Sequence, residues 1–465
     1  MNTDIKYEFL LVPIPIFSFI IFSSLSLYWV QSPYDAWRIY EILILILINL
    51  FGILYLKKNK LSYFKKPKIQ KFFILSLCLI PISVINSILL ATQPERAIAD
   101  ASLYFLLFSC CLILSIWMRI NKELTNQLTA ILAVIPILTL VFLPISIIDR
   151  LNGGEGVWTQ SFTNIRMLDD ALLPCLFLLW GRTGFLNITH YQDQKRQRII
   201  SIFIFIVSTI YILSFLFHGA RACLFAIFFG LILTIISSKI REYKFYKLPI
   251  ISILSAVLLF YCYTLVQFKN IGSPLIRYDT SGRTELWAKS INIWINHPFF
   301  GVGGNHFLLE QPYILAAHPH NIILKFLSEW GLGSIFFILF AIIFSILIFK
   351  NRNKINFFIF AGIISITVNS LLSGSMLYPA SQILSIWLIA YGLSFLKIYK
   401  VSDYFLNLKF KNYIWIFLIV ISISGLLYVH SVDIVCNQCI SVDLEGAPAF
   451  WDSGRAIHLS SIDSK

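Results

Sequence analysis

The chain has 465 residues, of which 58% are hydrophobic and only 13% are charged, and its mean hydropathy is +0.79. Soluble domains are about one quarter charged, so this composition excludes a water-soluble fold. The net charge of +14 requires no nucleic-acid partner, because Lys and Arg gather in the cytoplasmic loops of membrane proteins, where they contact anionic membrane lipids.

Apolar runs recur along the whole chain, and each can cross a hydrocarbon core of roughly 30 Å as an α-helix. We predict thirteen membrane helices, near residues 9–30, 39–56, 72–91, 101–118, 128–148, 169–181, 199–217, 222–238, 249–266, 334–349, 357–373, 381–397 and 413–429. No cleavage site follows the first run, which we interpret as a retained helix. The predicted fold is an all-α, polytopic transmembrane bundle of about 12 to 13 helices, with one long outer loop that contains short amphipathic helices.

The positions of Lys and Arg predict the orientation, because loops rich in these residues stay in the cytoplasm. With the N-terminus inside, most of the 37 Lys and Arg residues fall in connections that face the cytoplasm. The resulting division is an N-terminal bundle at 1–266, an outer catalytic loop at 267–333, C-terminal helices at 334–429 and an outer tail at 430–465.

Cysteine usage leaves one open question, in the outer tail. Six of the eight cysteines lie in or beside apolar runs, where a free thiol behaves as a small hydrophobe. Cys436 and Cys439 form a Cys-x-x-Cys sequence, which an oxidising compartment would permit to form a disulfide. No further pair of metal ligands accompanies them.

The long outer loop contains a predicted amphipathic helix. Its apolar residues recur at helical spacing, at Leu286, Trp287, Ile291 and Trp294. We expect this helix to lie on the membrane surface, between a start signal at Ser281 and Pro298, with Arg283 at its head. Glycines at 301, 303 and 304 follow, and they allow a tight turn that permits close approach.

A second helix of the loop begins after His320 and Asn321. Asn321 is a predicted cap, which leaves His320 close to the positive end of the helix dipole. That position favours the neutral imidazole, which suits proton abstraction. Alternatively, His320 is a solvated loop residue, or it forms a metal pair with His318, although no Cys or paired carboxylates lie nearby in the sequence.

These motifs resemble the O-antigen ligase and polymerase superfamily of membrane glycan transferases. The resemblance rests on Arg283 and Trp287, on His297-Pro298 with Gly301-x-Gly303, and on His320-Asn321 followed by Glu329-x-Gly331-x-Gly333. It spans residues 281–334. The sequence Gly219-Ala220-Arg221 is similar to the family's small-residue-plus-Arg turn between two helices.

The resemblance implies that a glycan on undecaprenyl diphosphate is passed to an acceptor hydroxyl at the periplasmic face of the bacterial inner membrane. It implies that His320 is the general base and that Arg283 and Arg221 hold the diphosphate. Arginine suits this role because its planar fork binds phosphate oxygens bidentately. Inversion at the sugar carbon is expected, without a metal or another cofactor.

Further residues complete the predicted substrate-binding set. Arg166 lies in a polar run, 162–166, that also resembles a patch in these transferases, and it is a candidate contact to the donor. The other members are His318, Asn321 and Trp287. The alternatives are a solvated loop charge for Arg166, an interface residue that extends its charge to water for Arg221, and an interface anchor for Trp287.

Three acceptors share this predicted site. A ligase uses the lipid A core, a polymerase uses a second lipid-linked repeat unit, and a protein O-oligosaccharyltransferase uses Ser or Thr of an exported protein such as a pilin. Ligases of the family commonly have twelve helices, so the thirteenth helix and outer tail are more typical of the protein-glycosylating branch. A transporter of the same lipid-linked glycan is the non-enzymatic alternative, but we find no repeated halves.

Overall fold

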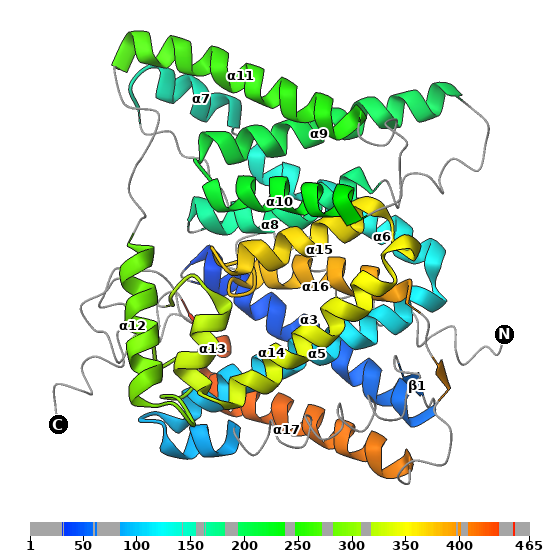
Figure 1. Cartoon of the computed structure of the whole chain (residues 1–465), viewed down its shortest axis with the longest axis vertical. Helices are drawn as coiled ribbons and strands as arrows, with labels where there is room; N and C mark the ends of the chain where they lie inside the picture. Colours follow the sequence, from blue (N-terminus) through cyan, green and yellow to red (C-terminus); the bar gives the residue numbers. More distant parts are fainter. Residues whose placement is uncertain are drawn as a thin grey trace. The chain divides into compact units, whose positions relative to one another are not determined.

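The computed structural model describes residues 30, 32–58, 61–62, 84–141, 143–154, 162, 164–181, 194–237, 247–271, 282–307, 318–396, 399–400, 408–436 and 450–451. Within these residues the chain is almost entirely helical, and it folds into two compact units (Figure 1). The first unit comprises residues 1–115, 282–351 and 395–465, and the second comprises 116–281 and 352–394.

The first unit is built from long helices of the two chain ends and from the segment that follows Gly282. Its elements are α3 (Pro33–Lys58), β1 (Leu61–Ser62), most of α5 (Pro94–Ile120), α12 (Arg283–Asn296), α13 (Ile322–Trp330), α14 (Gly333–Lys350), β2 (Tyr399–Lys400) and α17 (Leu408–Val435). The two short strands pair antiparallel. The buried Asn49 side chain donates to the Leu106 carbonyl oxygen (3.1 Å), which joins α3 to α5.

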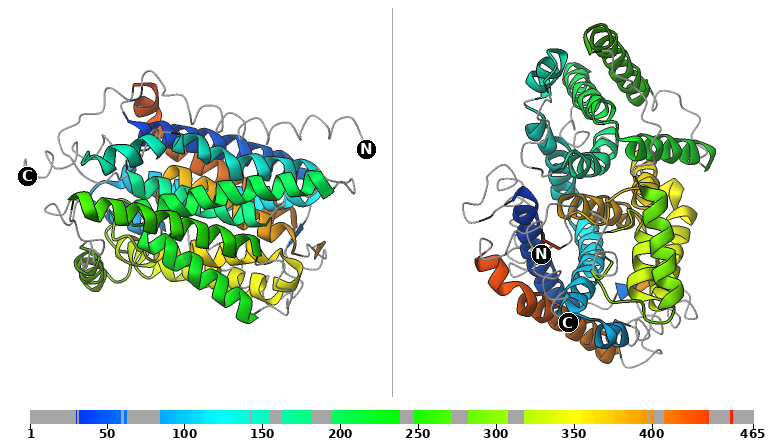
Figure 2. Two further views of the ribbon diagram at one scale, coloured as in Figure 1. Left: turned by 90° about the horizontal axis from the view of Figure 1, so that it is seen from above. Right: turned by 90° about the vertical axis from the view of Figure 1, so that its left-hand side faces the viewer.

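The second unit holds the middle of the chain. Its elements are α6 (Lys122–Val134), η2 (Ile135–Leu140), α7 (Leu143–Leu151), α8 (Ile165–Trp180), α9 (Gln194–Phe217), α10 (Arg221–Ser237), α11 (Lys247–Ile271), η5 (Arg352–Lys354), α15 (Phe357–Ser370) and α16 (Pro379–Ser394). Figure 2 shows α9, α10 and α11 running side by side in roughly one direction. Such an arrangement is typical of a membrane bundle.

The predicted all-α polytopic bundle is confirmed. Seven described helices are long and apolar enough to cross a membrane, and α10 and α15 are shorter apolar helices. Eleven of the thirteen predicted spans coincide with helices. The first, 9–30, lies outside the described residues, and the third, 72–91, is described only from residue 84. The chain is therefore a multi-pass membrane protein, while its division into membrane and outer segments stays a prediction.

Helix α8 is the short sixth span of the sequence, and the second unit surrounds it. Nearly every side chain from Met167 to Trp180 is buried. At Gly362 of α15, an added Cβ would lie 2.6 Å from the Cβ of Phe177, so the glycine permits close packing of the two helices. A helix covered on all sides need not match the length of a lipid-facing span, and it can carry the carboxylates of Asp169 and Asp170.

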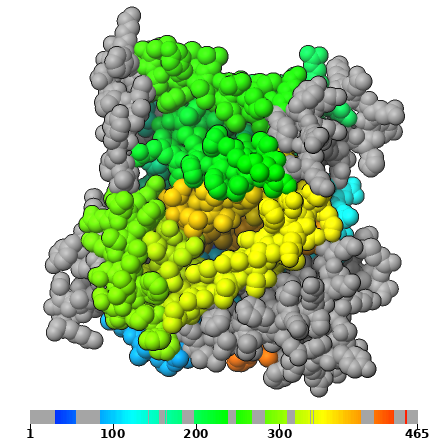
Figure 3. Space-filling model, in the orientation of Figure 1, coloured from blue at the N-terminus to red at the C-terminus, as the bar shows by residue number. Residues whose placement is uncertain are grey.

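Helix α12 differs from the spanning helices of the first unit in its direction. In Figures 1 and 2 it runs across the direction of α3, α14 and α17. Apolar side chains of α12 are exposed on one side, and Ile291 and Ile295, four residues apart, are 43% and 63% exposed. Figure 3 shows α12 and α14 uncovered on one face. These features fit the predicted helix on the membrane surface.

Candidate active site

Helix α12 begins and ends where the sequence predicts. It begins at Arg283, the residue expected at its head, and ends at Asn296, before Pro298. The residue before it, Gly282, has a φ of +72°, and no side chain caps the helix. Its buried residues are Leu286, Ser290 and Ile293. Ile291 is 43% exposed and lies outside this buried stripe, which starts at Leu286 and follows a spacing of four and three residues; an exposed Ile291 fits a helix whose apolar face contacts the membrane. Arg283 is half-buried in the first turn.

The predicted glycine turn is confirmed, and the group that approaches it is the backbone of α13. Gly301 has a φ of +66°, and a Cβ added there would lie 2.3 Å from the Glu329 carbonyl carbon. The Gly303 N–H donates to the Glu329 carbonyl oxygen (2.8 Å), and the Val302 N–H donates to that of Ser328 (3.1 Å). These bonds attach the turn to the C-terminal end of α13.

The start of α13 places His320 in a strained conformation. The predicted cap is confirmed: the Asn321 Oδ1 accepts from the N–H groups of Ile323 (3.0 Å) and Leu324 (3.1 Å). His320, directly before the cap, has a φ of +54°, in the left-handed region. A non-glycine residue there costs on the order of 1–3 kcal/mol, and such residues cluster at functional sites. No local sequence pattern predicts this strain.

Two side chains hold the segment that carries His320. The Trp287 Nε1 donates to the Pro319 carbonyl oxygen (3.0 Å), which ties α12 to the segment before α13. The buried His318 accepts from the His320 N–H through Nδ1 (3.1 Å), and the two rings lie 4.4 Å apart. The structure therefore brings Trp287, His318, His320 and Asn321 together.

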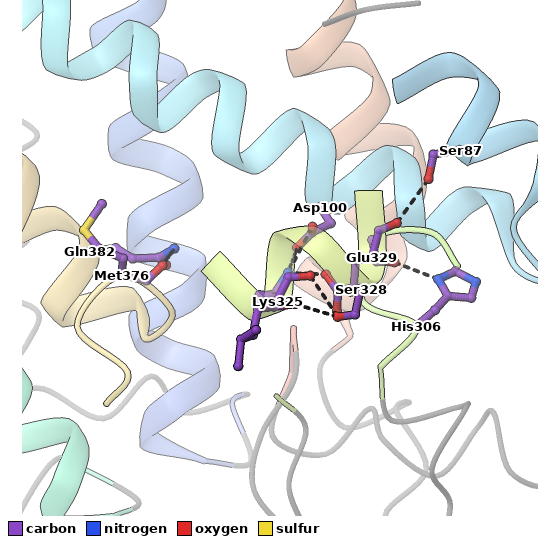
Figure 4. A network of polar contacts seen from close by, with 10 residues as sticks. Ser87, Asp100, His306, Lys325, Ser328, Glu329, Met376 and Gln382 are labelled. Atoms are coloured by element: carbon purple, nitrogen blue, oxygen red, sulfur yellow. Dashed lines mark hydrogen bonds and ion pairs between the residues drawn. The ribbon is translucent and has the colours of Figure 1, made fainter. Parts of the chain in front are cut away.

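A buried ion network anchors α13 to α5 (Figure 4). Both carboxylate oxygens of Asp100 lie 3.1 Å from the Lys325 Nζ. The Glu329 Oε2 lies 2.5 Å from the same nitrogen. The Ser87 hydroxyl donates to the Glu329 carbonyl oxygen (3.2 Å). Sequence reasoning missed this network, although Lys325 and Glu329 stand four residues apart on an otherwise apolar helix.

Burial sets the protonation behaviour of this region. It raises the pKa of Glu329 to about 7, although the nearby Lys325 ammonium opposes the shift. For Lys325, burial acts to lower the pKa, but the carboxylates of Asp100 and Glu329 outweigh it and raise the pKa above its usual range. Burial also lowers the pKa of His306, whose Nδ1 donates to the Gly304 carbonyl oxygen (2.7 Å). His306 is therefore a neutral residue that braces the glycine turn.

The remaining predicted residues, Arg166 and Arg221, both lie in the second unit and both bond to Gly219. Arg166 lies in the first turn of α8, where the Asn164 Oδ1 accepts from its N–H (2.8 Å). Its Nη1 donates to the Gly219 carbonyl oxygen (3.1 Å). Arg221 is exposed and begins α10 two residues after Gly219. The Gly219 carbonyl oxygen thus accepts from the Arg166 side chain (3.1 Å) and from the Arg221 backbone N–H (2.9 Å), which brings the first turns of α8 and α10 to the same turn of the chain. The N-terminus of a helix favours an anion.

Fold and site together define a multi-pass membrane protein with an imidazole at the mouth of a loop helix and arginines at helix ends. Residues 205–338 match the family model described as O-antigen ligase. The matched segment contains Arg221, Arg283 and His320, and it confirms the resemblance predicted from the motifs. It supports glycan transfer of the O-antigen ligase or polymerase type. No curated protein matches the chain.

A metal pair of His318 and His320 is the alternative to a catalytic role of His320. Among the residues that the structure describes, no three His, Cys, Asp or Glu side chains are arranged to hold a metal ion. Metal independence stays a prediction.

Proposed function

We propose that this protein transfers a glycan from undecaprenyl diphosphate to an acceptor hydroxyl at the periplasmic face of the bacterial inner membrane. The observation that carries the proposal is the left-handed His320, with a φ of +54°, directly before the capped start of α13. A residue held against its preferred conformation by surrounding bonds is pre-organised. The family match at residues 205–338 supplies the type of reaction.

In the proposed reaction, the imidazole of His320 accepts the proton of the acceptor hydroxyl. The hydroxyl oxygen attacks the anomeric carbon of the donor sugar as the bond from that carbon to the diphosphate oxygen breaks. The polyprenyl diphosphate leaves with the bonding electrons, so the sugar carbon is inverted. His318 and Trp287 hold the segment from which His320 acts, through the bonds to the His320 N–H and to the Pro319 carbonyl oxygen.

The arginines are assigned to the diphosphate. Arg283 and Arg221 bind its oxygens, as the family resemblance implies, and a permanently charged guanidinium stabilises the leaving group without a metal. Arg166 contributes from the first turn of α8. Arg221 is exposed and Arg283 is half-buried, so neither side chain is closed off from solvent.

Two observations support the periplasmic assignment. Lys and Arg alternate between the connections in the pattern expected for an N-terminus inside. Cys436, which directly follows α17, is disulfide-bonded, while its neighbour Cys439 lies outside the described residues. Disulfides persist in oxidising compartments and are rare in the cytosol. The tail after α17 is therefore assigned to the periplasm, together with the loop that carries His320.

For the acceptor we propose the lipid A core, with the hydroxyl of an exported protein as the second candidate. The second candidate is favoured by α17, whose segment Tyr413–Val435 is long enough to form an additional span. It is also favoured by the tail, where the Phe450 ring stacks on His430 of α17 (3.9 Å) and its carbonyl oxygen accepts from Arg38 of α3 (3.1 Å). These contacts fix Phe450 against α3 and α17, and a tail held there would offer a surface for a protein acceptor.

The test is glycan transfer by purified protein in liposomes that contain a lipid-linked oligosaccharide. His320→Ala should lower the turnover by about 10²- to 10⁴-fold, the usual contribution of a general base. Arg283→Ala should raise the KM for the donor. Lys289→Ala is the control, since Lys289 is a cation of the same helix that pairs with Glu285 of its own helix on the surface (3.4 Å). Wild-type activity of His320→Ala would refute the proposal.

The acceptor is identified by the glycan that a deletion strain lacks. Loss from the lipid A core indicates a ligase. Loss of long chains with retention of single repeats indicates a polymerase, and loss from exported proteins indicates a protein O-oligosaccharyltransferase.

A further inference from the structure

The turn between α9 and α10 is formed by hydrogen bonds between backbone groups. The Ala220 N–H donates to the Phe215 carbonyl oxygen (2.9 Å) and the Gly219 N–H to that of Leu216 (3.1 Å). With Gly219 at a φ of +61°, this is the Schellman ending of a helix. In the described part of the chain, no atom lies within 4 Å of a Cβ built on Gly219. The turn is therefore open on the side that Gly219 presents.

The residue before this turn, His218, is held by a buried carboxylate. Its Nδ1 donates to the Asp169 Oδ1 at 2.6 Å, and the side chains are 0% and 1% exposed. Asp169 belongs to α8 and stands 49 residues earlier in the chain. A hydrogen bond to a charged group is short and about twice as strong as a neutral one. This pair fixes the end of α9 relative to the start of α8.

Helix α8 is itself held firmly beside Asp169. The next carboxylate, Asp170, accepts from the Asn369 Nδ2 (2.5 Å), the Ser373 hydroxyl (3.0 Å) and the Gly374 N–H (3.0 Å). These donors lie at the end of α15 and in the segment before α16. Asp169 therefore projects from a helix whose first turns cannot shift without breaking several buried bonds.

Two neighbouring residues of the turn are thus attached to α8. Asp169 holds His218 on one side of Gly219, and Arg166 donates to the Gly219 carbonyl oxygen from the same helix (3.1 Å). Arg221 follows two residues later as the first residue of α10. Any change in the His218 bond is transmitted to Gly219 and Arg221, because the backbone between them is a single tight turn.

We propose that the Asp169–His218 pair positions the turn from His218 to Arg221. It thereby fixes the direction in which the Arg221 side chain meets the donor diphosphate. This inference rests on the proposed function, which assigns the diphosphate to Arg221. We assign neither partner a catalytic role, because both side chains are fully buried. The pair acts through the backbone of Gly219 and Ala220 and lowers the cost of ordering Arg221 around the phosphate oxygens.

The test compares two amide replacements of one residue. His218→Asn places its amide nitrogen near the position of Nδ1 and can still donate to Asp169, whereas His218→Gln places it near Nε2. We expect His218→Asn to keep the KM for the lipid-linked donor within about twofold of wild type. His218→Gln and Asp169→Asn should raise it by roughly 10- to 100-fold, the range expected for loss of a bond to a charged group. Turnover at saturating donor should change by less than about threefold.

Thr209→Val serves as the matched control, because Thr209 is a buried residue of α9 whose hydroxyl donates to the Phe205 carbonyl oxygen of the same helix (2.8 Å). It should leave the KM unchanged. Equal KM values for His218→Asn and His218→Gln would overturn the positioning role. Loss of turnover in both would also overturn it, since it would show a chemical role for the imidazole.

Arg221→Ala separates this inference from the proposed function. If Arg221→Ala raises the KM for the donor while His218→Gln and Asp169→Asn do not, the positioning role alone is refuted. If Arg221→Ala leaves the KM unchanged, the assignment of the diphosphate to Arg221 is wrong, and the inference fails with it.

Discussion

Replacement of Lys325 by Met tests whether the buried ion network anchors the segment that carries His320. Lys325 is the only cation among the three side chains of this network, and it lies between the carboxylates of Asp100 and Glu329. The side chains are 5%, 3% and 0% exposed in that order. Methionine fills a similar volume but leaves two acids without their counter-charge.

The expected loss of stability follows from the burial of the three charged side chains. Removal of one partner from a buried ion pair destabilises a protein by about 3–5 kcal/mol, because the remaining charge is left desolvated. The unfolding midpoint in detergent should fall by roughly 5–10 °C. Loss of the network should also reduce glycan transfer, because α13 begins directly after His320 and Asn321.

The assay is thermal unfolding of the purified protein, followed for a graded set of variants. The triple variant Asp100→Asn, Lys325→Met, Glu329→Gln removes all three charges and should recover most of the lost stability, since neutral groups cost less to bury than an unpaired charge. If Lys325→Met unfolds at the wild-type temperature, or if the triple variant is no more stable than the single one, this reasoning is refuted.

The same network predicts a pH dependence. Burial raises the pKa of Glu329 from 4.5 to about 7, so the folded state binds this proton more tightly than the unfolded chain does. The resulting stability is fully present below about pH 4.5 and is lost as the pH rises through about 7. The Glu329→Gln variant lacks this titrating carboxyl group, so its stability should decline less between about pH 5 and pH 8. A parallel decline in both proteins would contradict the assignment.

Three further predictions concern the turns and the chemistry. Gly219→Ala should cost about 1–2 kcal/mol for its left-handed backbone alone, whereas Gly301→Ala should cost clearly more because its Cβ would overlap the Glu329 backbone; equal melting temperatures would contradict this. Trp287→Phe removes the bond to the Pro319 carbonyl oxygen and should lower turnover by about tenfold, the effect of roughly 1.4 kcal/mol. Treatment with EDTA should leave glycan transfer unchanged, and restoration of activity by an added metal would disprove metal independence.

Local sequence rules predicted much of the fold and the start of the site. The helical spans follow from apolar runs, and the Asn321 cap follows from the residue type at the start of a periodic segment. The glycine turn was predictable because few other residues adopt its backbone angles. Each of these depends on the propensities of neighbouring residues, and the match at residues 205–338 confirms the family resemblance drawn from them.

The tertiary structure decided which groups meet. Lys325 pairs with Asp100 across 225 residues, and Asp169 pairs with His218 across 49. The choice of such partners depends on how helices pack, which local periodicity does not specify. The same packing brings the α13 backbone into close contact with Gly301. It also holds His320 in a backbone conformation that its own residue type does not favour. Residue types determine where the helices begin and end. Packing between helices determines which charged groups pair and which residue is held in a strained backbone conformation.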